Sequence, residues 1–120
     1  MKKIDIVVGA RPNFIKAFPV YDALEKLNRF DIRLINTGQH YDENMANIFF
    51  RQLKMKLPDI NLMVGSGTHA EQTAKIMVET EKLFMQNKPD LVMVFGDVNS
   101  TVSTALSASK LHIPVAHIEA

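Results

Sequence analysis

The sequence predicts an α/β protein with at most one domain, residues 1–120, in which helices flank a doubly wound parallel sheet in three layers. Short apolar runs alternate with segments whose apolar residues recur every three or four positions, which indicates strands alternating with helices. The run Leu91–Phe95 is apolar throughout, as expected of a strand that helices cover on both faces. This alternation predicts parallel strands joined by right-handed crossovers.

The first half of the chain supplies two strands and two helices. Residues Ile4–Val8 and Ile32–Asn36 are rich in Ile, Val and Leu, which favours strands. Between them a helix begins near Pro12, because the missing amide donor of proline costs nothing in a first helical turn. We expect this helix to end near Asn28 and a second helix to cover Asn44–Leu53. The first helix is expected to bury an apolar face formed by Phe14, Ala17, Phe18, Tyr21, Leu24 and Leu27.

The stretch Lys54–Val64 has the weakest pattern. Its short apolar trace, Ile60–Val64, is consistent with a short strand at the edge of the sheet. The next helix is expected to begin at a capping box, in which Thr68 and Glu71 satisfy two free amides at the helix start. This helix is expected to end near Asn87.

The last third of the chain completes the alternation. After the apolar strand Leu91–Phe95 we expect a helix that Asn99 caps and that ends near Lys110, followed by a strand over Pro114–Ile118. A doubly wound sheet normally continues with a helix at that point, and here nothing follows to cover the strand. We therefore expect the chain to be the amino-terminal part of something larger.

Composition and charge argue against several classes of protein. The chain has no cysteine, which excludes disulfides, thiolate metal sites and cysteine nucleophiles. Its net charge is +1 with scattered basic residues, so it lacks the basic stripe of a nucleic-acid-binding protein. The first apolar run is interrupted by Asp5, unlike a secretory signal, and no run is long enough to span a membrane. We expect a cytoplasmic protein that binds neither nucleic acid nor membrane.

Charged and amide side chains follow four of the apolar runs. The segments are Gly9–Asn13, Thr37–Asp42, Gly96–Thr101 and His117–Ala120. The carboxyl ends of parallel strands lie along one edge of the sheet, and ligands of open α/β sheets bind along that edge. The sequence therefore predicts that these four segments converge on one crevice.

The predicted catalytic residues lie at the centre of this crevice. In the usual strand order, 3-2-1-4-5, the order reverses between the first and fourth strands. Arg11 and Asp97 follow these two strands and are expected to face each other, with Glu119 beside Asp97. Two carboxylates and an arginine suit proton transfer on a substrate that carries phosphate. For each residue alone, the better interpretation is that Asp97 caps the following turn and pairs with Arg11; the set at the switch point favours function.

Other polar residues extend the predicted site. Lys16 lies on the first helix and is expected to reach over the crevice, although an exposed helical lysine is usually only solvated. Gln39 and His40 follow the second strand and are expected to bind substrate, although a local hydrogen bond explains His40 equally well. His117 shares its side of the last strand with Glu119 and is placed to orient it.

Several patterns carry no chemistry. Residues 65–70 match G-x-G-x-x-A, but they follow the weakest strand, and the capping box explains their helix better than a dinucleotide site does. No set of His and carboxylate residues has metal-ligand spacing, so we predict no metal. His69 and His112 are expected at the surface.

On these motifs the chain resembles the non-hydrolysing UDP-N-acetylglucosamine 2-epimerases. The matching segments are Gly9–Asn13, Thr37–His40, Gly96–Thr101 and His117–Ala120. The resemblance covers the whole chain but only about the first third of a typical family member. Members that UDP-GlcNAc activates tend to carry Gln-His-Arg-Glu after the second strand. Here Tyr41 and Asp42 replace the second half of that motif, so the resemblance does not imply allosteric activation.

The resemblance implies the amino-terminal half of a glycosyltransferase-B-type fold, with two Rossmann-like domains and the active site between them. It implies interconversion of UDP-GlcNAc and UDP-ManNAc by elimination of UDP to 2-acetamidoglucal and re-addition, without an external cofactor. By the same resemblance Asp97 and Glu119 are catalytic carboxylates, whereas Arg11 and Lys16 contact phosphate and sugar. The remaining site residues of the family lie beyond Ala120, so this chain alone is expected to be inactive. Family members commonly form homodimers and feed surface-polysaccharide synthesis.

Three other functions remain open. Relatives with the same motif after the second strand act on other UDP-2-acetamido sugars, including 2,3-diacetamido uronic acids. A glycosyltransferase of the same two-domain architecture would transfer the sugar and leave no deuterium at C2. A stand-alone α/β module that binds a nucleotide or phosphate would catalyse nothing.

Overall fold

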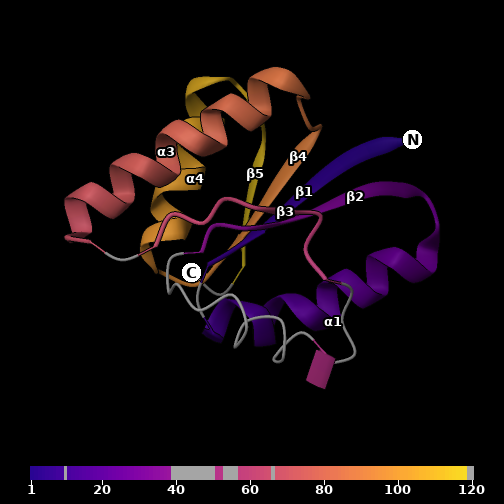
Figure 1. Ribbon diagram of the computed structural model, residues 1–120. Coiled ribbons are helices and arrows are strands. Elements are labelled where there is room, and N and C mark those ends of the chain that lie inside the picture. Colours follow the sequence, from indigo (N-terminus) through magenta and orange to yellow (C-terminus); the bar gives the residue numbers. More distant parts are fainter. Residues whose placement is uncertain (10, 39–50, 53–56, 66, 119–120) are drawn as a thin grey trace.

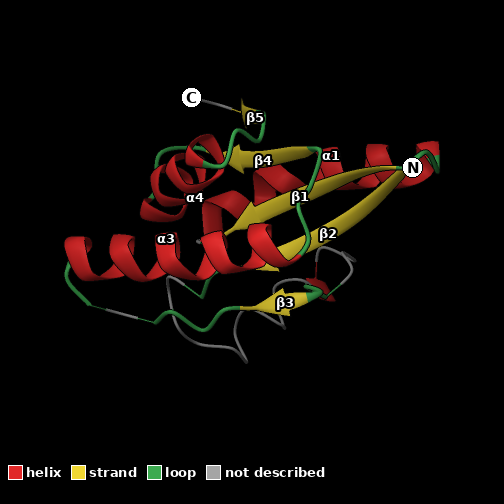
Figure 2. Cartoon of the chain, turned by 90° about the horizontal axis from the view of Figure 1, so that it is seen from above, coloured by secondary structure: helices red, strands yellow, loops and turns green. Residues whose placement is uncertain are grey.

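The computed structural model describes residues 1–9, 11–38, 51–52, 57–65 and 67–118, except for the side chains of Arg11 and Pro12. Its centre is a five-stranded sheet with the order β3-β2-β1-β4-β5. The strands are β1 (Lys2–Val8), β2 (Phe30–Asn36), β3 (Ile60–Asn61), β4 (Leu91–Phe95) and β5 (Val115–Ile118). Every neighbouring pair is parallel, and Figure 2 shows the strands side by side in this order.

Helices cover both faces of the sheet, in three layers (Figure 1). The described helices are α1 (Arg11–Leu27), α3 (His69–Gln86) and α4 (Asn99–Lys110). One core cluster packs Phe14 and Tyr21 of α1 against Ile6 and its neighbours on the sheet. A second cluster packs Phe84 of α3 against Val7 and the other face. Successive β1 residues thus enter opposite cores, as the two-residue period of a strand requires.

The structure confirms the predicted α/β class and strand order. The edge strand is confirmed at Ile60–Asn61, shorter than the apolar trace that predicted it. Both β1 and β2 begin two residues before the predicted Ile4 and Ile32, because each strand pairs along its whole length from Lys2↔Phe30 onward. Of the helix predicted over 44–53, only residues 51–52 lie in the described part, and these are helical.

The helix ends confirm one capping prediction and correct another. The capping box is present: Thr68 Oγ1 accepts from Glu71 N at 3.1 Å, and Thr68 N donates to Glu71 Oε1 at 3.2 Å. The predicted cap at Asn99 is wrong, since Val98 occupies the N-cap without a side-chain hydrogen bond and Asn99 is the first helical residue. Leu27 is 55% exposed, because it lies in the last turn of α1, past the sheet core. Among the described helices none is both long and apolar enough to cross a membrane.

Candidate functional site

Three described turns meet where the central strands end. The first follows β1 at Gly9, the second follows β2 at Thr37, and the third follows β4 at Gly96. Gly38 and Gly96 have φ of +75° and +68°, in the left-handed region that glycine adopts without the steric penalty of a Cβ. The chain can therefore turn sharply at Gly38 and at Gly96, which places the residues that follow each glycine close to the carboxyl edge of the sheet.

The start of α4 packs so closely against the turn at Gly9 that a side chain there would clash. A Cβ on Gly9 would lie 1.9 Å from Ser100 Oγ and 2.5 Å from Thr37 Oγ1. The hydroxyls of Thr37 and Ser100 are themselves hydrogen-bonded at 2.8 Å. Glycine at position 9 thus lets the end of β1 approach α4 closely at the carboxyl edge of the sheet.

Asn13 connects the ends of β1 and β4 across the switch point. Its side chain is 1% exposed, with Oδ1 accepting from Gly9 N at 3.1 Å and Nδ2 donating to Phe95 O at 3.0 Å. Thr101 Oγ1 donates to the same Phe95 carbonyl at 2.6 Å. The sequence placed Asn13 in a loop of the site but gave it no role, since an asparagine in a first helical turn is ordinarily exposed.

Asp97 lies directly after this fixed backbone, on the turn between β4 and α4. It is exposed, and its carboxylate accepts no hydrogen bond from any described residue. The alternative in which Asp97 caps the following turn is wrong, because no side-chain hydrogen bond caps the start of α4. The pairing with Arg11 involves a side chain outside the described part. Lys16 Nζ lies 3.5 Å from the place that a Cβ on Gly96 would take, so α1 brings this ammonium to the Asp97 turn.

His117 contacts the Asp97 turn from the other side. Its Nε2 is 2.5 Å from Gly96 O, and because a carbonyl can only accept, Nε2 carries the proton. The prediction was that His117 orients Glu119, which lies outside the described residues. In the described part of the chain the ring bonds to the backbone that immediately precedes Asp97.

The other predicted residues are described only in part or not at all. Arg11 begins α1 at the end of β1, but its side chain lies outside the described part. Gln39, His40 and Glu119 lie outside it entirely. Their roles remain predictions from the sequence.

A hydrogen-bond network that the sequence did not reveal links the starts of α3 and α4. Asn99 Nδ2 donates to Gln72 Oε1 at 2.8 Å and to His69 Nδ1 at 3.0 Å. Gln72 Nε2 in turn donates to Gly65 O at 2.8 Å. His69 is exposed as predicted, yet its ring is part of this hydrogen-bond network. Contacts over this sequence separation leave no local signal.

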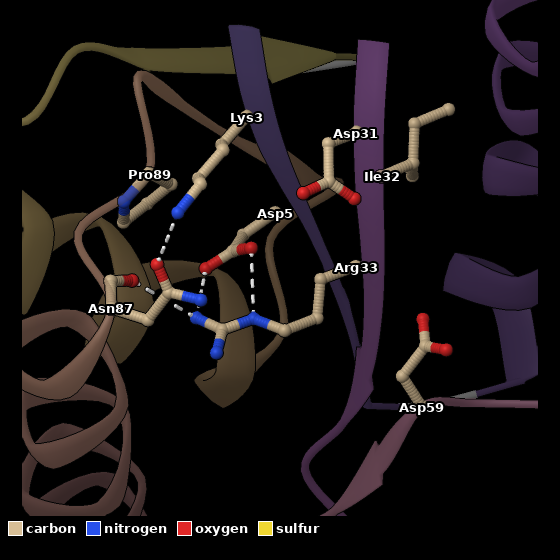
Figure 3. Close-up of a pocket in the computed structure, with 8 residues that line it drawn as sticks. All are labelled: Lys3, Asp5, Asp31, Ile32, Arg33, Asp59, Asn87 and Pro89. Atoms are coloured by element: carbon tan, nitrogen blue, oxygen red, sulfur yellow. Dashed lines mark hydrogen bonds and ion pairs between the residues drawn. The ribbon is translucent and has the colours of Figure 1, made fainter. Parts of the chain in front are cut away.

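The opposite, amino edge of the sheet contains a hollow of about 310 Å³ (Figure 3). Two of its charged side chains, Asp5 and Arg33, are paired with each other. Arg33 donates to both oxygens of Asp5, from Nε at 3.0 Å and from Nη2 at 2.6 Å. Lys3 Nζ donates to Asn87 Oδ1 at 2.8 Å, while Lys3 N donates to Asp90 Oδ2 at 2.7 Å. These bonds join β1, β2 and the end of α3, so this hollow is primarily structural.

Burial and Arg33 shift the pKa of Asp5 in opposite directions. Burial raises the pKa of this carboxyl above its ordinary value, and the hydrogen bond and charge of Arg33 oppose this rise without cancelling it. Burial therefore disfavours the ionised form of Asp5, and Arg33 is the residue that most stabilises it. A carboxylate committed in this way is poorly placed to serve a ligand.

The comparisons with known proteins agree with the geometry of the carboxyl edge. A family model described as UDP-N-acetylglucosamine 2-epimerase matches residues 22–120. The UDP-N-acetylglucosamine 2-epimerase of Methanocaldococcus jannaschii is 52% identical over 118 residues, which are 98% of this chain and 32% of that protein. The UDP-2,3-diacetamido-2,3-dideoxy-D-glucuronate 2-epimerase of Pseudomonas aeruginosa is 47% identical over 98% of this chain and 33% of its own length.

A solved structure gives the same result for the fold. The crystal structure of the M. jannaschii UDP-GlcNAc 2-epimerase with UDP-GlcNAc and UDP matches with a TM-score of 0.93 at 51% identity. The match covers 98% of this chain and 32% of that one. The Rossmann-like fold is therefore confirmed, and the chain spans about a third of the length of the curated relatives that it matches.

Proposed function

The chain belongs to the UDP-N-acetylglucosamine 2-epimerase family, and from this premise we propose that the whole protein interconverts UDP-GlcNAc and UDP-ManNAc. The observation that carries the proposal is the position of Asp97. It is an exposed carboxylate at the switch point of the sheet, with Lys16 beside its turn. The preceding backbone is held by the side chains of Asn13, Thr101 and His117.

The chemistry of this reaction requires groups of the kind that the carboxyl edge presents. UDP leaves C1 with the bonding electrons while a base removes the C2 proton, which gives 2-acetamidoglucal. UDP then adds back at C1 while an acid delivers a proton to the opposite face of C2, so no net oxidation or reduction occurs. Proton transfer of this kind is typical work for a pair of carboxylates.

We assign roles to six residues on this basis. Asp97 and Glu119 exchange protons with the sugar, while Arg11, Lys16, Gln39 and His40 bind the sugar and the diphosphate. For Asp97 and Lys16 the geometry of the described turn supports the assignment. For the other four it rests on their place in the sequence motifs.

The second candidate substrate is a UDP-2,3-diacetamido uronic acid. It is favoured by one observation: the P. aeruginosa relative that acts on such a sugar is 47% identical, close to the 52% of the M. jannaschii relative. The motif that follows Gly38 lies outside the described residues. The choice is therefore an outcome of the experiment below.

We also propose that the whole protein works in the cytoplasm as a homodimer, with the UDP-sugar as its small-molecule partner. Nucleotide sugars are made in that compartment, and dimers are common in the family that the chain resembles. Light scattering of the purified whole protein tests the assembly: a mass of two chains supports the proposal, and a monomer at working concentration contradicts it.

The direct test follows the C2 proton of UDP-GlcNAc by NMR in D2O with the whole protein. Deuterium at C2 together with growing UDP-ManNAc supports the proposal. If C2 stays protonated, the same test on a UDP-2,3-diacetamido uronic acid decides for or against the second candidate. Free UDP with the sugar moved to an acceptor and no C2 deuterium indicates a glycosyltransferase. Tight binding without turnover indicates a binding module.

A further inference from the structure

The Asn13 side chain bonds to the backbone at the carboxyl ends of both central strands, at the switch point. It accepts from Gly9 N, in the turn that leads to Arg11, and donates to Phe95 O, two residues before Asp97. At 1% exposure it is shielded from water, so neither bond is easily replaced by solvent. The two loops that carry predicted charged residues are therefore connected through one amide group.

The environment of Asn13 requires an amide and no other group of that size. One partner is a donor and the other an acceptor, and the asparagine side chain presents both functions on one planar group. An ionised aspartate has the same shape but only acceptor atoms. It would leave the Phe95 carbonyl without this donor and direct negative charge at it.

Asn13 also lies next to the glycine that shapes the Asp97 turn. A Cβ on Gly96 would be 3.7 Å from Asn13 Nδ2 and 3.5 Å from Lys16 Nζ, so both α1 side chains lie against this turn. A change at Asn13 is therefore transmitted to the backbone on which Asp97 stands and to the start of the helix that carries Lys16.

We propose that Asn13 is a positioning residue for C2 proton transfer, which fixes the Asp97 turn relative to the loop leading to Arg11. The inference rests on the proposed function and deepens it. Asn13 contacts backbone only and is not expected to touch the sugar. Its loss should therefore reduce kcat through misplacement of the reacting groups and leave KM nearly unchanged.

The test compares Asn13→Asp with Asn13→Ala in the whole protein, by the rate of C2 deuterium incorporation into whichever UDP-sugar the wild type exchanges. At about pH 8 we expect kcat of Asn13→Asp to fall about 100-fold, the loss typical of a displaced reacting group. Burial raises the pKa of such a carboxyl, and its protonated form regains an O–H donor for Phe95 O. The kcat ratio of Asn13→Asp to wild type should therefore rise as the pH is lowered to about 6.

Two controls separate positioning from general destabilisation. Asn13→Ala has no group to protonate, so its kcat ratio to wild type should stay low at every pH. Thr80→Ala removes another fully buried side chain, which donates to Ile76 O at 2.7 Å and is 2.8 Å from Ser107 Oγ, in the middle of α3. It should lower the melting temperature while leaving kcat and its pH profile as in the wild type.

Two results would overturn the inference alone. One is wild-type kcat in Asn13→Asp at about pH 8; the other is a loss that stays constant as the pH is lowered. A wild-type protein that exchanges no C2 proton contradicts the proposed function as well. That result is visible without any variant, so the two failures can be distinguished.

Discussion

The two edges of the sheet use their charged residues in opposite ways. At the amino edge Asp5 and Arg33 neutralise each other on neighbouring strands, at the paired position Asp5↔Arg33 of the β1–β2 register. At the carboxyl edge the backbone is satisfied by the amide of Asn13 and the ring of His117. There the Asp97 carboxylate accepts no hydrogen bond from the part of the chain that the structure describes.

The difference shows why shape alone misidentifies the site. The amino edge has a distinct hollow, yet its buried carboxylate, Asp5, is already engaged with Arg33. At the carboxyl edge the side chains of Asn13, Thr101 and His117 hold the backbone, and the exposed Asp97 carboxylate stays available for a ligand. Unused charge at a topological switch point is therefore the better indicator of function than a concave surface.

The largest expected effect separates two carboxylates on the carboxyl side. Asp97→Asn should lower C2 exchange by about 1000-fold, within the range of general acid–base catalysis, with little change in unfolding. Glu71→Gln is the matched control, because Glu71 is committed to the capping box and glutamine serves there equally well. NMR in D2O measures both. Equal exchange rates in the two variants would contradict the assignment of Asp97.

The next effect concerns the amino edge and falls on stability. Arg33→Leu leaves the Asp5 carboxylate, only 4% exposed, without its partner and should destabilise the fold by about 3–5 kcal/mol. Lys26→Leu is the control, since this lysine is 76% exposed and its bridge to Asp22 is worth less than about 1 kcal/mol. Urea unfolding of the whole protein, with hydrogen exchange at β1 and β2 amides, checks both.

The folded fraction of Arg33→Leu tests the comparison itself. If the amino edge is structural, this fraction should exchange C2 protons at the wild-type rate. A loss of exchange in fully folded protein would give the amino edge a role in catalysis.

A smaller effect tests the close packing at the carboxyl edge. Gly9→Ala places a methyl group 1.9 Å from Ser100 Oγ, and the required shift should cost about 1–3 kcal/mol. Gly67→Ala is the control, because the new methyl group would lie an ordinary 3.7 Å from Glu71 Cβ, with an effect within about 0.5 kcal/mol. Thermal unfolding gives the comparison. Equal melting temperatures of the two variants would contradict close packing between the end of β1 and α4.

The smallest effect is the pH dependence of the Asp5–Arg33 pair. Because burial raises the pKa of Asp5, the folded state binds this proton more tightly than the unfolded chain. The contribution of Asp5 to stability is therefore largest below the ordinary carboxyl pKa of 3.8 and declines as the pH rises through the raised value.

Urea midpoints of wild type and Asp5→Asn across this range measure that contribution. The wild type should gain stability relative to the variant as the pH falls from neutral to about 4. The opposite trend would mean that Arg33 outweighs burial in setting this pKa.

The sequence was sufficient for features that depend on local pattern. The runs Ile4–Val8 and Leu91–Phe95 predicted their strands, and the alternation with helices predicted the sheet order. The capping box was correct because Thr68 and Glu71 interact within one turn. These features need no knowledge of distant segments.

The failures involve side chains whose partners are far away in sequence. Asn99 was predicted to cap its own helix, but its amide bonds to His69 and Gln72 on α3. The bond from His117 to Gly96, just after β4, was likewise not foreseen, while the predicted relation of His117 to Glu119 lies outside the described residues. The hydrogen bond from Asn13 to Phe95 was missed for the same reason. Such pairings are fixed by strand order and helix packing, which a one-dimensional pattern does not specify.

The most direct test of the contrast between the two edges is a crystal structure of the whole protein with UDP-GlcNAc bound. We expect the sugar at the carboxyl edge, with the Asp97 carboxylate within about 3 Å of a sugar atom and the Asp5–Arg33 pair intact. A sugar bound in the hollow beside Lys3 and Arg33, or away from Asp97 altogether, would contradict it.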